Sequence, residues 1–122
     1  MIVEEFKKII SERIYISKTT DDEWDYGINK CCERLINLVS NNLEEAIDYI
    51  RNDCTADEFV FLSEVMEEIA EKTQSQKFID VLYETARKYP EECKDYNIIS
   101  FIKAAEELIA EPSLSEEQSY ER

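Results

Sequence analysis

Histidine is absent from this chain of 122 residues, which contains one glycine and two prolines. The side chain that most often serves as a general base or as a nitrogen ligand for metals is therefore missing. No serine, threonine or cysteine can be activated by a histidine, and one glycine cannot build a glycine-rich phosphate loop. The acidic residues show no calcium-loop spacing. We therefore expect no enzyme and neither a metal nor a cofactor site.

The scarcity of glycine and proline also excludes fold classes. All-β folds use both residues in their turns, and βαβ units need glycines where a strand meets a helix. No apolar run approaches the roughly 20 residues of a membrane-spanning helix. The first ten residues, MIVEEFKKII, include acids and lack the basic-then-apolar layout of a signal peptide. These features predict a cytoplasmic protein without a membrane segment.

The four cysteines, Cys31, Cys32, Cys54 and Cys93, have no metal-binding or redox spacing. Cys31 and Cys32 are adjacent in a helical pattern, so their side chains point about 100° apart and do not bridge easily. We expect four reduced thiols that act as small apolar side chains in a cytosolic protein.

Apolar residues recur at helical spacing along most of the chain and predict about six helices. The first covers roughly residues 2 to 15, the second begins near Asp22, and residues 90–96 (PEECKDY) add one further turn. The fourth has the widest apolar surface, which predicts a central position. Short connections predict that consecutive helices pack as antiparallel neighbours. The predicted fold is all-α, an antiparallel helical bundle or a short stack of helical hairpins in residues 1–110, with 111–122 as an acidic, disordered tail.

Capping side chains mark the starts of the later helices. Residues 42–45 (NLEE) and 55–58 (TADE) have the spacing of capping boxes, in which the first side chain accepts from a free backbone N–H and the last reaches back. Ser75 is a good N-cap for the fifth helix, and Asn97 is expected to cap the sixth.

The stretch DDEWDYG, residues 21–27, contains the only tryptophan and the only glycine. Trp24 could contact a partner with the acids as its rim, or it could belong to the core. It lies four residues before Ile28, in phase with the apolar stripe of the second helix, which favours the core position with Asp22 as N-cap. Gly27 lowers helix propensity, and a closely approaching neighbour helix would explain it. Tyr26 falls about 200° around the helix from Trp24, which predicts an outward position among the acids.

The net charge is −15, from 29 acidic and 14 basic residues. Such a surface repels nucleic-acid phosphates and anionic lipid. It favours a basic protein partner, or it serves solubility alone. The basic residues are scattered rather than clustered, so nucleic-acid binding is not expected.

Acids and an outward tyrosine suggest where a basic partner would bind. They gather at the start of the second helix, around the connection between the third and fourth helices, and along the fourth helix, where glutamates four residues apart repel. The candidate partner-binding residues are Asp21, Asp22, Glu23, Asp25, Tyr26, Asp53, Asp57, Glu64, Glu67, Glu68 and Glu71.

Three segments between residues 20 and 110 carry a resemblance: DEWDYGINKCCERLINLV, FLSEVMEEIAEKTQSQKFIDVLYETARKYPEE and IISFIKAAEELI. They resemble small helical immunity proteins encoded beside bacterial polymorphic toxins, including those of contact-dependent growth-inhibition systems. The resemblance implies a cytoplasmic inhibitor that binds one cognate toxin C-terminal domain, often a nuclease, and blocks its active site or substrate surface. It transfers no particular binding residue to this chain.

Two other functions are compatible with the sequence. A helical-repeat scaffold of tetratricopeptide or HEAT type would bind a peptide in a groove, although no internal repeat is evident. An enzyme or metal protein that uses carboxylates alone is the third hypothesis. We expect an immunity protein because an acidic inhibitor can compete for the positive groove of a nuclease, with association rates towards about 10⁸–10⁹ M⁻¹s⁻¹ at low salt.

Overall fold

The computed structural model describes residues 2–20 and 23–110, and every regular element in these stretches is helical. The elements are α1 (Val3–Thr20), α2 (Asp25–Asn41), α3 (Leu43–Asn52), α4 (Ala56–Leu62), the 3₁₀ turn η1 (Ser63–Val65), α5 (Met66–Thr73), α6 (Gln76–Ala86), α7 (Pro90–Tyr96) and α8 (Ile98–Glu107). The all-α prediction is therefore confirmed for the described residues. The tail predicted at 111–122 lies outside them.

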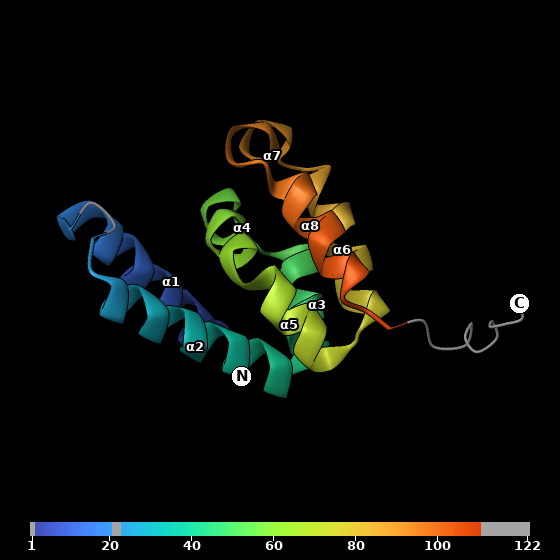
Figure 1. Cartoon of the computed structure of the whole chain (residues 1–122), viewed down its shortest axis with the longest axis horizontal. Coiled ribbons are helices and arrows are strands. Elements are labelled where there is room, and N and C mark those ends of the chain that lie inside the picture. Colours follow the sequence, from blue (N-terminus) through green and yellow to red (C-terminus); the bar gives the residue numbers. More distant parts are fainter. Residues whose placement is uncertain (1, 21–22, 111–122) are drawn as a thin grey trace, which may run out of the picture.

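The helices form two parts (Figure 1). α1 and α2 make a long antiparallel hairpin, and α3 to α8 form a body beside it. Within the body the largest contacts join helices that are not consecutive, α3 with α6 and α5 with α8. The prediction that consecutive helices pack as neighbours therefore holds for α1 and α2, whereas the main contacts of the body join helices that are not consecutive. α4, η1 and α5 together correspond to the predicted fourth helix, and they lie between the hairpin and the helices α6 and α8.

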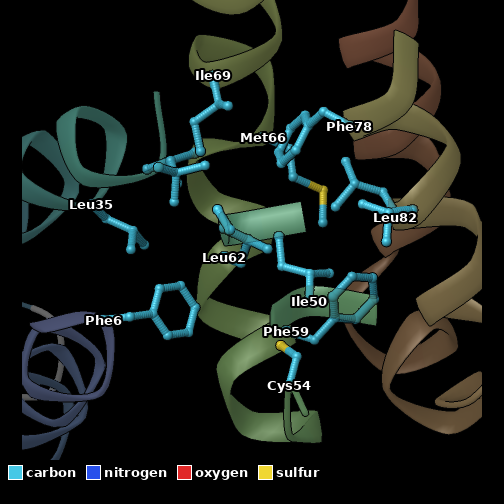
Figure 2. Packing of buried hydrophobic residues seen from close by; sticks show 14 of the residues in the cluster. Phe6, Leu35, Ile50, Cys54, Phe59, Leu62, Met66, Ile69, Phe78 and Leu82 are labelled. Atoms are coloured by element: carbon cyan, nitrogen blue, oxygen red, sulfur yellow. The ribbon is translucent and has the colours of Figure 1, made fainter. Parts of the chain in front are cut away.

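The central segment supplies the middle of the hydrophobic core, as its wide apolar surface predicts. Phe59, Leu62, Met66 and Ile69 are each 0% exposed, and burial of a side chain of this size contributes about 2 kcal/mol. Figure 2 shows them among core residues from the hairpin, α3 and α6: Phe6, Leu35, Ile50, Phe78 and Leu82.

Two of the predicted caps are confirmed. The Thr55 hydroxyl accepts the Glu58 backbone N–H at 3.2 Å, and a Glu58 carboxylate oxygen accepts the Thr55 backbone N–H at 3.1 Å. The Ser75 hydroxyl accepts the Phe78 backbone N–H at 3.1 Å. Both helix starts follow from contacts within four residues of sequence.

The two predictions based on asparagine are wrong. The Asn42 side chain donates back to the Leu38 carbonyl at 2.9 Å and does not cap α3. Its expected box partner, Glu45, instead accepts the backbone N–H of Ile2 at 2.9 Å. Asn97 gives no side-chain cap to α8, because it holds a left-handed conformation (φ 56°) that ends α7.

The first helix is longer than predicted. It continues through Thr20, and within it the hydroxyls of Thr19 and Thr20 donate to the carbonyls of Tyr15 and Ile16, one turn back, at 2.8 and 2.7 Å. The helix therefore accommodates the two threonines with their hydroxyls satisfied. The N-cap predicted at Asp22 lies outside the described residues.

Trp24 is not a core residue: it is 50% exposed and occupies the N-cap position of α2 without a side-chain cap. Its indole ring lies over Gly27, where an added Cβ would come 2.2 Å from the nearest ring carbon. The neighbour that requires the glycine is thus Trp24 itself and not another helix. Tyr26 is 66% exposed, which confirms its outward position.

Polar contacts fasten the hairpin to the body. Glu58 is 6% exposed, and its carboxylate accepts from Lys7 at 3.0 Å and from the Tyr49 hydroxyl at 2.8 Å. Further along α1, Arg13 donates from Nε and Nη2 to the two carboxylate oxygens of Glu64, at 2.9 and 2.8 Å. These contacts, about two helical turns apart on α1, fix how the hairpin lies against α4 and η1.

All four cysteines are free, as predicted. Among the helices that the structure describes, none is long and apolar enough to cross a membrane.

Candidate functional site

A cleft of about 540 Å³ lies between α1 of the hairpin and the body helices α4, α7 and α8. The four helices that line it are labelled in Figure 1. We call it the acidic cleft, and it is lined by Arg13, Ser17, Asp57, Val60, Phe61, Ser63, Glu64, Glu92, Asp95, Tyr96 and Phe101.

Carboxylates dominate the charge of the acidic cleft. Asp57, Glu64, Glu92 and Asp95 face one cation, Arg13. Within residues 2–20 and 23–110, no lysine or arginine forms an ion pair with Asp57, Glu92 or Asp95. Three negative charges are therefore available to a cation that enters the cleft.

Glu64 plays a different part from the other three acids. Its bidentate contact with Arg13 is the strong planar geometry of an arginine–carboxylate pair. Arg13 is 7% exposed, and its guanidinium lies 5.1 Å from the centre of the Phe61 ring. The pair therefore builds the wall of the cleft, and its charges largely cancel.

Two exposed aromatic side chains lie beside these acids. Tyr96 is 56% exposed and Phe101 is 40% exposed. Aromatic residues beside buried or partly buried charges are the usual anchors of protein interfaces. The acidic cleft can therefore hold basic side chains of a partner while its rings contact their apolar parts.

A larger groove of about 690 Å³ lies on another part of the body, between α6, α7 and α8. Its charged lining residues are Arg87 and Lys94, and no acid lines it. It contains none of the residues predicted from the sequence. Because the protein's excess charge is acidic, we place the candidate site in the acidic cleft.

The acidic cleft contains only two of the acids predicted from the sequence, Asp57 and Glu64. Glu23, Asp25 and Tyr26 are exposed at the tip of the hairpin, and Asp53 is exposed at the end of α3. The α5 acids Glu67, Glu68 and Glu71 do not line the cleft, and Asp21 and Asp22 lie outside the described residues.

Sequence reasoning missed Glu92, Asp95, Tyr96 and Phe101. Residues 92, 95 and 96 are spaced by three and four, so they share one face of α7. Pro90 is a favourable first residue of a helix, so the sequence indicates a helix here in which these three side chains lie on one face. Phe101 gave no such signal, because its exposure depends on how α8 packs.

The cysteines offer little chemistry. Burial raises the pKa of the Cys32 thiol to about 11 and that of Cys54 to about 12, so both stay protonated at neutral pH. A protonated thiol is a poor nucleophile and a poor metal ligand. Among the described residues, no group of three or more cysteine, aspartate or glutamate side chains is placed to hold a metal ion.

Comparison of the chain with protein-family models, with curated proteins and with solved structures finds no match.

Proposed function

We propose that this protein is an immunity protein, which binds and neutralises a cognate toxin domain, and that the toxin is a basic nuclease. The observation that carries the proposal is the acidic cleft, in which three carboxylates without an ion-pair partner in the described residues lie beside two exposed aromatic rings. The net charge of −15 and the resemblance to helical immunity proteins support it.

The cleft indicates how inhibition would work. A nuclease holds nucleic-acid phosphates with lysine and arginine side chains. Asp57, Glu92 and Asp95 would accept these same side chains, while Tyr96 and Phe101 contact their aliphatic stems. Substrate and inhibitor would then compete for one positive surface. The protein's negative field would also accelerate the encounter, so the association rate should fall as salt is added.

The test is a binding titration with the C-terminal domain encoded immediately upstream, at low and at high salt. We expect a nanomolar or tighter complex and protection of cells that express this domain. In the cleft variant, Asp57→Asn, Glu92→Gln and Asp95→Asn are combined, and affinity should fall by at least about 100-fold. The matched control combines Glu67→Gln, Glu68→Gln and Glu71→Gln, which removes the same charge from α5.

The two variants separate three outcomes. A loss confined to the cleft variant supports the proposed site, whereas equal losses mean that only net charge matters. A loss confined to the α5 variant would move the interface to the acids that sequence reasoning favoured. A helical scaffold that only holds a peptide would bind without protecting cells, and this result would contradict the immunity function.

A further inference from the structure

The tip of the α1–α2 hairpin exposes a pair of aromatic rings that the core does not use. Trp24 is 50% exposed and Tyr26 is 66% exposed, and their ring centres lie 6.2 Å apart. Tryptophan is highly buried on average. An exposed tryptophan paired with an exposed tyrosine therefore needs an explanation other than folding. We call residues 23–30 the hairpin tip.

The only glycine in the chain leaves space for the tryptophan ring. An added Cβ at Gly27 would come within 2.2 Å of the indole, so any other residue there would displace the ring. Glycine lowers helix propensity, and Trp24 at the N-cap gives α2 no side-chain cap. Both features, the glycine and the missing cap, weaken the start of α2, and both accompany the exposed indole. A tryptophan ring presents a large contact area and has only two rotatable side-chain angles, so it loses little entropy when a partner arrives.

The charges around the rings indicate the chemistry of that partner. Glu23 and Asp25 are exposed beside Trp24, and neither has an ion-pair partner within the described ranges. Lys30 lies 5.8 Å from the centre of the Tyr26 ring, so the tip already holds one cation over an aromatic face. The cation–π contacts found among the described residues do not include Trp24.

We propose that the hairpin tip binds an arginine or lysine side chain of a basic partner protein, with the Trp24 indole as the cation–π surface and Glu23 and Asp25 as counter-charges. Tryptophan is the best aromatic side chain for such a contact. The chemistry of the proposal stands on the tip alone; only the identity of the partner as a toxin rests on the proposed function.

α1 connects the two surfaces, because its last turns contribute to the acidic cleft and the hairpin tip follows it in the chain. Ser17 lines the cleft, and α1 ends three residues later at Thr20, about 5 Å further along the helix axis. A folded domain that fills the cleft and also extends along the end of α1 could therefore contact the tip as well. The tip then acts as a second anchor outside the cleft.

Trp24 is the only tryptophan, so its fluorescence reports on the tip alone. The first probe is a hexa-arginine peptide, with hexa-glutamate as the control. We expect hexa-arginine to shift the Trp24 emission and to protect the ring from acrylamide quenching. Combined Glu23→Gln and Asp25→Asn substitutions should weaken this response several-fold, whereas the cleft variant should retain it. If hexa-arginine leaves emission and quenching unchanged, the proposal is wrong.

The second probe is the domain encoded upstream. Trp24→Ser should weaken its binding by roughly 30-fold, the effect of an interface anchor. Gly27→Ala keeps every charge but displaces the indole, so it should weaken binding while the protein unfolds at the same or a higher urea concentration. A merely structural glycine would show the reverse pattern.

The outcomes also separate this proposal from the immunity function. If the upstream domain binds tightly but Trp24→Ser and the Trp24 emission show no change, the tip proposal fails and the immunity function stands. If the upstream domain does not bind and hexa-arginine still shields Trp24, the immunity function fails and the tip remains a site for basic segments.

Discussion

At the base of the α1–α2 hairpin, Glu58 is almost completely buried and accepts three hydrogen bonds, whereas at the tip Glu23 and Asp25 are exposed beside Trp24. Both ends are rich in acids and aromatics. At the base these groups fasten one part of the molecule to another, and at the tip the same residue types face solvent. The comparison teaches that composition overstates the acidic charge available to a partner, because part of it is neutralised within the fold.

The buried acid Glu58 and its exposed neighbour Asp57 should differ most in how much their loss destabilises the fold. Glu58→Ala removes the acceptor of the buried Tyr49 hydroxyl, the partner of Lys7 and the capping box of α4. We expect a loss of about 3 kcal/mol in the free energy of unfolding. Asp57→Ala, at the exposed neighbour, should cost less than about 1 kcal/mol. Urea unfolding of both variants measures the difference, and similar losses would contradict the assignment of Glu58 as structural.

A smaller difference is expected between two glutamates one turn apart. Glu64→Gln replaces a charged partner of the buried Arg13, so it should lower the free energy of unfolding by about 1–2 kcal/mol. Glu68 is exposed, and Glu68→Gln should change stability by less than about 0.5 kcal/mol. Thermal and urea unfolding can compare them. If Glu64→Gln is neutral, the Arg13 contact does not fasten the hairpin.

At the tip, even the largest side chain should matter little for folding. Trp24→Ser should cost less than about 1 kcal/mol, because the residue is 50% exposed and belongs neither to the core nor to the side chains packed against it. Urea unfolding followed by circular dichroism is the appropriate measurement, since the variant has no tryptophan. A loss of several kcal/mol would mean that the tip is part of the folding core after all.

The smallest effect concerns the middle of the hairpin and depends on pH. Arg34 on α2 donates to Glu12 on α1, and this hydrogen bond lowers the pKa of the Glu12 carboxyl below its usual 4.5. A lowered carboxyl pKa stabilises the fold above the unfolded value, and this contribution is lost as the pH falls through the folded value. Arg34→Gln should therefore cost about 0.5 kcal/mol at pH 7, and the cost should shrink at pH 3. An unchanged difference at pH 3 would show that Arg34 acts through packing instead.

The sequence predicted those features of the fold that depend on nearby residues. The Thr55 and Ser75 caps need partners only three residues away, so their residue types were enough. Helical spacing likewise predicted the buried face of the central segment. The capping box predicted at Asn42 does not form, because its expected partner Glu45 accepts the backbone N–H of Ile2, which is 43 residues away in sequence.

Trp24 shows a second limit of periodicity. Its phase relative to Ile28 predicts the direction of the side chain around the helix, but not whether a neighbouring element covers that turn.

The acidic cleft shows a third limit. Asp57 and Glu64 were recognised by charge, yet Glu92 and Asp95 join them only because α7 folds back beside α4. That juxtaposition is a property of the packed body.

An exposed aromatic pair has a consequence for the protein before it meets any partner. Rings that bind another protein can also bind each other, and two copies could associate through their tips. A net charge of −15 opposes this, since like-charged molecules repel before the rings touch. This colloidal protection reaches only about 8 Å at physiological ionic strength and about 3 Å in 1 M salt. The acids would thus keep molecules with an exposed aromatic pair apart until an oppositely charged molecule removes the repulsion.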